Sequence, residues 1–399
     1  MKKTKLKDIC NISAGGTPSR SNINYWNNGD IPWCKIGDFS GKYINQVKEN
    51  ITEEGLKNSS AKIFNRGTIL YTIFATVGEV AILETESATN QAIAGLEIIN
   101  NEVELEYLYY YLKSLKFVML KKSRGVAQNN INLGILKNIE IKIPDKMEQI
   151  NIAKILANIE KIIDKKKKQL KELNTIIKSQ FVEMFGDIKI KEKVKNVSVY
   201  FSRGKTPNYV EKSNIKVISQ ACIYWDEFKY EKAKYQDENK ALKSLEKTIE
   251  NGDVLITSTG TGTLGRCNVY YGEEHKYMAD SHVSILRFNY KEMNPIFFKY
   301  YFMQEKVQKE LYAECVNGST NQIELSKDRF LNFRILIPEI TLQNQFSEIV
   351  KQIDKQKFES MIQLDKENRI VLKNIIKDTI EETNIIYEFL FKKYFEEGK

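Results

Sequence analysis

The segment Gly260–Gly265 has the glycine spacing of a nucleotide-binding loop, because it fits both Gly-x-Gly-x-x-Gly and Gly-x-x-x-x-Gly. In a Walker loop, a lysine and a Ser or Thr follow the last glycine and bind phosphate and magnesium. Here Arg266 and Cys267 follow instead. In a dinucleotide site, a helix begins at the glycines and faces the pyrophosphate, but residues 266–271 have the composition of a strand. The segment therefore predicts a strand-turn-strand element, and residues 75–78 predict a similar one in the first half.

Other patterns that would indicate catalysis or metal binding are absent from the sequence. No Pro-Pro pair occurs, although methyltransferases that flip adenine out of the duplex hold the base with one. The two histidines, His275 and His282, have no ligand-like neighbours, and no two cysteines are spaced as Cys-x-x-Cys. We expect neither a disulfide framework nor a metal or cofactor in this chain. The cysteines are Cys10, Cys34, Cys222, Cys267 and Cys315.

Several loops carry side chains suited to DNA contacts. Arg, Lys, Asn and Gln hydrogen-bond base edges in the major groove, while Lys, Arg, Ser and Thr also bind phosphates. For each of these residues a solvated loop position is an equally good interpretation. In the first half the candidates are Ser19, Arg20, Lys35, Thr76, Lys121, Arg124, Gln128, Asn129 and Asn130. In the second half they are Arg203, Lys205, Gln220, Ser258, Thr259, Thr261, Arg266, Ser319, Thr320, Asn321 and Gln322. Trp33 and Trp225 are interpreted as core residues.

Composition adds little to this hypothesis. The 399 residues include 61 Lys and Arg against 52 Asp and Glu, and the net charge of +9 attracts polyanions mildly. No apolar run is long enough to cross a bilayer, and the charged first residues differ from a signal peptide. We therefore expect a cytoplasmic protein that has no contact with a membrane.

The chain repeats itself, and this repeat determines how the candidate residues must be positioned. Pro144 and Gln149 reappear as Pro338 and Gln343, so both pairs are 194 residues apart. Upstream features recur in the same order: the Gly-Thr-Pro turns, the Gly-x-Val/Ile-Leu segments, and the polar turns at residues 90–93 and 280–283. A period this long indicates duplicated domains.

Each half is predicted to be a mixed α+β domain. Short β-branched and aromatic runs predict strands at residues 68–73 and 80–83, and at 254–257 and 283–288. Apolar and tyrosine residues at helical spacing predict helices at residues 105–120 and 295–311.

A long helix is predicted to follow each proline. From Leu156 to Met184, apolar residues recur at steps of three and four, which is typical of a coiled-coil seam, and the second copy has a weaker seam. We expect the two helices to pair in antiparallel orientation and to separate the two domains. The predicted boundaries are 1–144 for the first domain, 145–186 for its helix, 187–338 for the second domain and 339–399 for the distal helical region. The Lys165–Lys168 run is either a solvated face or a contact to DNA or a partner.

In this order the motifs resemble the specificity subunits of type I restriction-modification systems, over essentially the whole chain. The resemblance depends on Gly15–Ser19, on Ile31–Trp33 with Gly37–Phe39, on the Ile141–Pro144 junction with Gln149, and on Lys178–Gly186. The second half has only Ile215–Ile218 in place of Ile31–Trp33.

The resemblance implies a non-catalytic subunit with two target-recognition domains, each of which reads one half of a split sequence in double-stranded DNA. The helices would set the spacer and hold two methyltransferase subunits that use S-adenosylmethionine. Motor-nuclease subunits would join the full complex. The alternatives are a solitary sequence-specific DNA-binding adaptor or regulator and, less favoured, a metal-dependent nuclease.

Overall fold

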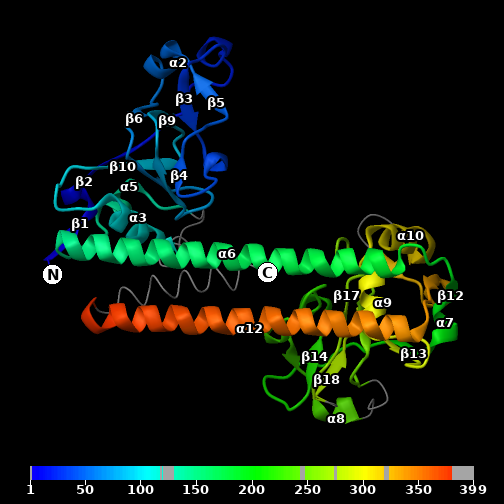
Figure 1. Ribbon diagram of the computed structural model, residues 1–399. Helices are drawn as coiled ribbons and strands as arrows, with labels where there is room; N and C mark the ends of the chain where they lie inside the picture. The colour runs from blue at the N-terminus through cyan, green and yellow to red at the C-terminus, as the bar shows by residue number, and fades with distance from the viewer. Residues whose placement is uncertain are drawn as a thin grey trace. The chain divides into compact units, whose positions relative to one another are not determined.

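Each half of the chain folds into small sheets and short helices that lead into one long helix (Figure 1). The computed structural model describes residues 2–116, 119, 130–242, 248–273, 276–318 and 323–379, with side chains up to residue 360. The chain divides into two units: the first contains residues up to Gln169 and the chain from Ser360 onwards, and the second contains Leu170–Glu359.

The first unit contains a five-stranded sheet of order β2-β10-β7-β8-β4, a four-stranded sheet of order β5-β3-β9-β6, and the β1-β11 pair. Its strands are β1 (Lys2–Lys5), β2 (Cys10–Ala14), β3 (Ile31–Cys34), β4 (Tyr43–Ile44), β5 (Glu49–Ile51), β6 (Ile63–Phe64), β7 (Ile69–Thr72), β8 (Val80–Leu83), β9 (Ser87–Thr89), β10 (Ile93–Ile98) and β11 (Glu140–Ile143). Its helices are α1 (Leu6–Ile9), η1 (Ile23–Tyr25), η2 (Ile36–Asp38), α2 (Glu53–Lys57), α3 (Leu105–Ser114), α5 (Leu133–Lys137) and the first part of α6 (Lys146–Phe185).

The second unit repeats this topology with one strand fewer in each of its two larger sheets: a sheet of order β13-β19-β16-β17, a sheet of order β15-β14-β18, and the β12-β22 and β20-β21 pairs. Its strands are β12 (Lys191–Lys193), β13 (Ser198–Arg203), β14 (Lys216–Ile218), β15 (Lys234–Tyr235), β16 (Val254–Thr257), β17 (Cys267–Val269), β18 (Tyr277–Ala279), β19 (Val283–Phe288), β20 (Val316–Asn317), β21 (Glu324–Leu325) and β22 (Arg334–Leu336). Its helices are α7 (Val194–Val197), η3 (Gln220–Cys222), η4 (Tyr230–Lys232), α8 (Glu238–Leu242), α9 (Pro295–Phe302), α10 (Glu305–Cys315), α11 (Lys327–Asn332) and the first part of α12 (Ile340–Thr379).

The expectation of two mixed α+β domains in tandem repeat is confirmed element by element. The β2-β10-β7-β8 order corresponds to β13-β19-β16-β17. The parallel pair of β3 with β9 corresponds to the parallel pair of β14 with β18. The predicted strand-turn-strand element is also confirmed, because β17 follows the glycine-rich loop directly and no helix begins there.

The buried glutamine at the start of each long helix explains why the Pro-to-Gln spacing repeats. The Gln149 side chain is fully buried. Its Nε2 donates to the carbonyl oxygens of Pro144 at 2.9 Å and Glu102 at 2.7 Å. Its Oε1 accepts from the backbone N–H of Glu104, the residue that caps α3, at 2.9 Å. One amide side chain therefore joins the start of α6 to the start of α3.

Gln343 makes the same three bonds in the second unit. It donates to Pro338 O at 2.8 Å and to Glu292 O at 3.0 Å, and it accepts from the N–H of Asn294, the α9 cap, at 2.9 Å. Gln343 is also fully buried. The repeat therefore preserves a hydrogen-bonded joint between the domain and its long helix.

The long helices begin where the sequence predicts, but their buried faces differ from the predicted seam. Leu156, Ile159 and Ile163 pack into the core of the first unit, against its own domain. Near the end of α6 the buried residues are Ile177, Phe181 and Phe185, spaced by four, and the predicted seam residue Gln180 is only partly buried.

The end of α6 and the start of α12 pack together within the second unit, where they run side by side in opposite directions (Figure 1). Phe181 and Phe185 each lie 5.5 Å, between ring centroids, from Phe346. Phe185 also packs edge-on against Phe297 of α9 at 4.7 Å. The four-residue spacing on α6 thus places two aromatic rings against both helices.

Two predicted helices are wrong in their extent. Residues 105–120 were expected to form one helix, but α3 ends at Ser114. Residues 295–311 were expected to form a single helix, but α9 ends at Phe302 and α10 begins at Glu305. Gln304 breaks the helix because its backbone is extended, with φ −63° and ψ 133°. Among the described residues, no helix is long and apolar enough to cross a membrane.

Replacing either buried glutamine by methionine keeps its volume but leaves one N–H and two carbonyls without their partner. We expect Gln149→Met and Gln343→Met to lower the unfolding free energy of their own unit by about 3 kcal/mol. Urea unfolding, followed by tryptophan fluorescence and circular dichroism, measures the loss. The exposed residues Gln169 and Gln352 provide the controls. If Gln169→Met and Gln352→Met lowered the unfolding free energy equally, the stabilising role of the two buried glutamines would be contradicted.

Candidate nucleic-acid interface

The loop between β2 and η1 lies so close to β9 and to Ser60 that only glycine fits at two of its positions. The N–H groups of Gly15 and Gly16 donate to Ile93 O at 3.1 Å and Thr89 O at 2.8 Å. A Cβ on Gly15 would lie 2.2 Å from the Thr89 carbonyl oxygen, and one on Gly16 would lie 2.3 Å from Ser60. This loop carries Ser19 and Arg20 away from the sheet.

Two tryptophans fix the far side of the same loop. The indole N–H of Trp33 donates to Gly16 O and that of Trp26 donates to Ser19 O, both at 3.0 Å. The two rings pack edge-on with centroids 5.0 Å apart. Trp33 is 2% exposed, so its interpretation as a core residue is confirmed. The Arg20 guanidinium lies over the Trp26 ring, 3.6 Å from its centroid.

Glu49 brings two of the predicted DNA contacts together. Its carboxylate forms ion pairs with Arg20 at 2.6 Å and with Lys35. The hydrogen bond from Lys35, aided by Arg20, holds the pKa of Glu49 below its usual value. The Arg20 and Lys35 side chains are still 53% and 36% exposed. One carboxylate therefore orients two cations, and the group keeps a net positive charge.

Backbone hydrogen bonds connect these cations to the other described candidates of the first unit. Asn90 N–H donates to Cys34 O, beside Lys35, and Ile73 N–H donates to Ala92 O. Exposed Gln91 lies in that turn and accepts a hydrogen bond from Thr17. Thr76 is exposed in the β7–β8 loop, and Asn130 precedes Ile131, which is bonded to Ile73. We call this group the first polar edge: Arg20, Lys35, Thr76, Gln91 and Asn130.

A second polar edge forms at the equivalent place in the second unit. Gly204 N–H donates to Val283 O at 2.9 Å and Lys205 N–H donates to Ala279 O at 3.2 Å, which repeats the bonds of Gly15 and Gly16. His282, in the β18–β19 turn, receives a backbone bond from Ser258 as Ala92 does from Ile73. The second polar edge consists of Lys205, Gln220, Thr259, Thr261, Arg266 and His282.

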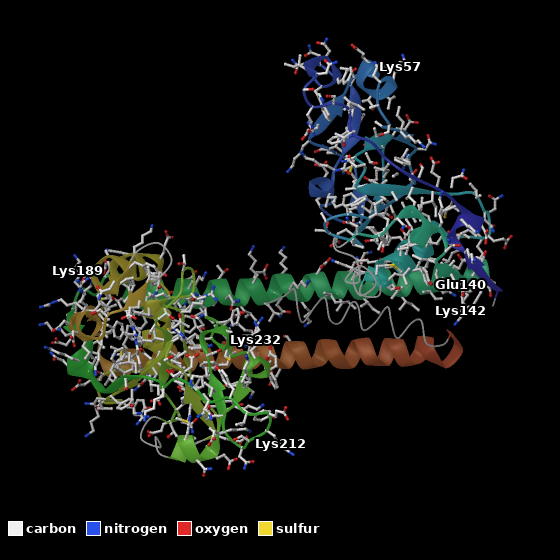
Figure 2. All side chains as sticks on the ribbon, turned by 180° about the vertical axis from the view of Figure 1, so that it is seen from behind. Lys57, Glu140, Lys142, Lys189, Lys212 and Lys232 are labelled. Carbon is white, nitrogen blue, oxygen red and sulfur yellow. The ribbon has the colours of Figure 1, made fainter. Side chains whose placement is uncertain are left out.

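Positive charge gathers beside this edge around Tyr224. Lys229, Lys232 and Arg266 lie 4.5, 5.2 and 5.6 Å from the centroid of its ring. A hydrogen bond from Lys232 to the hydroxyl lowers the pKa of Tyr224. Lys232 is exposed, and Figure 2 labels it on the second unit. Three cations around one neutral ring suit a phosphate contact.

One predicted residue is buried, and another is held by bonds within the second unit. Ser258 is fully buried, and its hydroxyl shares a hydrogen bond with Ser284 at 2.6 Å. The Arg203 guanidinium donates to the Leu325 carbonyl at 2.8 Å and pairs with Glu324 at 3.1 Å. Ser258 is therefore unavailable to a ligand, whereas Arg203, whose side chain is 34% exposed, is held by an ion pair as Arg20 is and stays a candidate.

Of the remaining candidates for DNA contacts, one is exposed and the others lie outside the described residues. Ser19 is exposed and hydrogen-bonded to Ser21. Eight candidates lie outside the described residues: Lys121, Arg124, Gln128, Asn129, Ser319, Thr320, Asn321 and Gln322.

Sequence reasoning missed Glu49, Gln91 and His282. The alignment of residues 90–93 with 280–283 placed Gln91 and His282 in equivalent turns, and that correspondence could have identified both. Nothing in the sequence points to Glu49, because its partners lie 29 and 14 residues upstream on other elements. In the described part of the chain, no three His, Cys, Asp or Glu side chains group as metal ligands.

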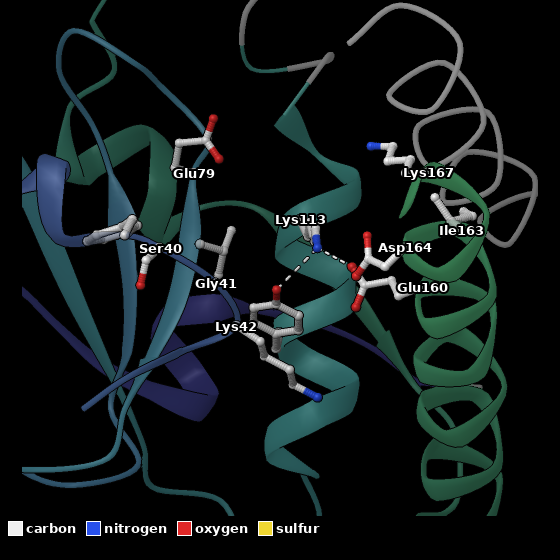
Figure 3. A pocket seen from close by; sticks show the side chains of 13 residues that line it. Ser40, Gly41, Lys42, Glu79, Lys113, Glu160, Ile163, Asp164 and Lys167 are labelled. Carbon is white, nitrogen blue, oxygen red and sulfur yellow. Dashed lines mark hydrogen bonds and ion pairs between the residues drawn. The ribbon is translucent and has the colours of Figure 1, made fainter. Parts of the chain in front are cut away.

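A cavity of about 340 Å³ lies where α6 meets the first domain (Figure 3). Lys113 of α3 points between the hydroxyl of Tyr109 and the carboxylate of Glu160 on α6. Tyr110 also donates to Glu160, at 2.9 Å. Burial tends to lower the pKa of Lys113, but Tyr109 and Glu160 raise it above its usual value. The Lys113–Glu160 ion pair in this lining joins α3 to α6.

In a comparison with protein families, the chain matches the type I restriction modification DNA specificity domain at residues 1–175 and again at residues 191–370. A curated relative is the type I restriction enzyme MjaIX specificity subunit of Methanocaldococcus jannaschii, 37% identical over 188 residues. That alignment covers 46% of this chain and 43% of the relative, so the match spans less than half of it. The MjaVIII specificity subunit of the same organism is 22% identical over 82% of this chain and 83% of its own.

Solved structures agree in fold. The S subunit of a type I restriction-modification system from M. genitalium has a TM-score of 0.53 at 14% identity, over 97% of this chain and 95% of that one. A chain from a study of complex assembly and conformational transition in the type I R-M system has a TM-score of 0.57 at 14% identity, covering 99% and 97%.

Glu49→Gln removes the carboxylate that restrains Arg20 and Lys35. We expect affinity for a mixed-sequence DNA duplex to rise several-fold at low salt, with a steeper salt dependence, because two cations become free to bind phosphates. Fluorescence anisotropy over a salt series measures both quantities. Glu53→Gln makes the same charge change on exposed α2, where Glu53 pairs only with Lys57. Equal gains in the two variants would mean that Glu49 acts through net charge alone.

Proposed function

Because the chain belongs to the family of type I restriction modification DNA specificity domains, we propose that it is the DNA sequence-specificity subunit of a type I restriction-modification complex. The observation that carries this proposal is the duplication of the polar edge. The two edges have the same backbone bonds, at Gly15 and Gly16 and at Gly204 and Lys205, but different side chains. Two copies of one framework with different hydrogen-bonding groups suit a target made of two different half-sites.

Each domain reads one half-site through its own edge. In the first, Arg20, Lys35 and Gln91 present donors and an amide to base edges or phosphates. In the second, Gln220, Thr259 and His282 take the place nearest the bases, and the cations around Tyr224 bind the phosphate backbone. Side-chain amides and imidazoles discriminate between base pairs, whereas lysines at phosphates add affinity without sequence preference.

The long helices set the distance between the half-sites. α6 contains 40 residues, which gives about 60 Å of helix at about 1.5 Å per residue. Each helix is fixed to its domain by a buried glutamine, and α6 also by the Lys113–Glu160 ion pair. A helix attached rigidly to its domain transmits any change in its length to the position of that domain.

The catalytic steps belong to partner subunits. Two methyltransferase subunits, which bind S-adenosylmethionine, dock on the helices, and motor-nuclease subunits complete the assembly. Exposed apolar side chains on both helices support protein contacts there, since Ile176 and Val182 of α6 are 47% and 62% exposed and Phe358 of α12 is 64% exposed.

Methylome mapping tests the proposal directly. The chain is expressed with the methyltransferase genes of its own genome in a host that lacks adenine methylation, and methylated adenines are mapped by single-molecule sequencing. We expect one split motif with two different half-sites and a fixed spacer. A host that carries the methyltransferase genes without this chain is the control. A continuous motif, or the same motif in the control, would refute the assignment.

Inserting one heptad between Lys167 and Lys168 tests the role of α6. Seven residues add about 10 Å of helix, so we expect the spacer to lengthen by about three base pairs while both half-sites stay the same. The methylome of the variant measures spacer and half-sites together. A variant in which seven residues are replaced without insertion should keep the original spacer. Changed half-site bases would contradict the separation of the two roles.

A further inference from the structure

His282 is the residue by which the second polar edge differs most from the first. Its backbone makes the same bonds as Ala92: the N–H of His282 donates to Asp280 Oδ1 at 2.8 Å, and that of Ala92 donates to Asn90 Oδ1 at 3.1 Å. Its carbonyl accepts from Ser258 N–H at 2.8 Å, as the Ala92 carbonyl does from Ile73. The turn is therefore the same in both units, and only the side chain differs.

The imidazole of His282 is held by a short chain of polar groups from three loops. Its Nδ1 lies 2.8 Å from the hydroxyl oxygen of Thr259. That hydroxyl in turn donates to Oε1 of Gln220 at 3.5 Å. Thr259 is itself fixed, because its carbonyl accepts from the Thr263 hydroxyl at 3.0 Å. His282 is exposed, so its ring is fixed on one side and open to solvent on the other.

The direction of these bonds determines which ring nitrogen carries the proton. A hydroxyl has a single hydrogen, and either Thr259 or Nδ1 of His282 can be the donor in their 2.8 Å bond; where Thr259 directs its hydrogen to Gln220, Nδ1 of His282 is the donor. In a neutral imidazole the other nitrogen is then an acceptor. In that tautomer Nε2 of His282 carries a lone pair, and the side chain is exposed.

Given the proposed function, on which this inference depends, we propose that His282 reads one base of the second half-site by accepting a hydrogen bond at Nε2. In the major groove the donors are the exocyclic amino groups of adenine, at N6, and cytosine, at N4, while guanine O6 and thymine O4 are acceptors. His282 thus selects an amino base over a keto base. Thr259 and Gln220 are positioning residues that hold the acceptor tautomer. The first domain lacks this selection because Ala92 stands in its turn.

The test is selection from randomised duplex DNA by the full-length chain, in complex with the methyltransferase chains that co-purify with it. For the wild type we expect a second half-site with one position restricted to adenine or cytosine. His282→Ala introduces the residue that the first unit carries in the same turn, and it should relax only that position, with a loss of discrimination on the order of tenfold.

Thr259→Val removes the acceptor for Nδ1 and so allows the other tautomer. This variant should keep binding to adenine or cytosine at that position and gain guanine and thymine, because Nε2–H then donates to a keto oxygen. A structural role alone would not produce this change at one base. The first half-site, selected in the same experiment, should be identical in all three proteins and reports on their folding.

Three results would overturn the inference. The first is that the position relaxed by His282→Ala prefers a keto base in the wild type. The second is that His282→Ala leaves the second half-site unchanged. The third is that Thr259→Val leaves the base preference unchanged, and this third result counts even if His282→Ala abolishes recognition of the whole second half-site. Failure of the wild type to select any split sequence would refute the proposed function instead, so the two failures are distinguishable.

Discussion

The joint made by one buried glutamine in each unit is the interaction on which the rest of the structure depends. Gln149 and Gln343 each satisfy two carbonyls and one N–H that would otherwise be buried without partners. An unsatisfied buried group costs about 1–3 kcal/mol, so detaching either long helix from its domain would carry a free-energy cost for each lost hydrogen bond. Because the same amide bonds the cap of α3 or α9, the direction of the long helix is tied to the helix that packs against the central sheet. A change at the helix is thereby transmitted to the domain.

The polar edges show how a duplicated framework carries different exposed side chains. Their positions are set by backbone bonds and by close approaches that only glycine allows, as at Gly15 and Gly204, where a Cβ would lie 2.2 Å and 2.0 Å from a carbonyl oxygen. None of these bonds involves the side chains that face outward. Exposed residues such as Gln91 and His282 can therefore differ between the units without a cost to folding, since surface substitutions usually change stability by less than about 0.5 kcal/mol.

Most of the framework was predictable from the sequence, and most of the chemistry at the edges was not. The repeated Pro-to-Gln pairs were visible because the same three hydrogen bonds call for an amide side chain at both positions. The strands were visible because β-branched residues mark them. The break at Gln304 carries no local signal, since its neighbours are good helix formers. Ser258 was wrongly predicted as a DNA contact because it directly follows a buried strand, and its own side chain is buried against Ser284. His282 was passed over because a lone histidine without a ligand pattern is usually structural, and its partners Thr259 and Gln220 are distant in the sequence.

The two units restrain the side chains of their polar edges by different physical means. In the first, the Arg20 guanidinium is held over the Trp26 ring and paired with Glu49; a flexible cation is restrained by an aromatic ring and a carboxylate. In the second, a short aromatic side chain is restrained by a hydroxyl. Ordering a rotamer-rich side chain on binding costs about 0.5–1.5 kcal/mol, and Arg20 loses more freedom than His282 because it has more rotatable bonds. The restraint on Arg20 must therefore be stronger. The carboxylate of Glu49, which provides that restraint, also competes with phosphate for Arg20, and the second edge has no such competitor. In the proposed function, the first edge would gain order at some expense of phosphate affinity, and the second would take its phosphate contacts from the separate cations around Tyr224.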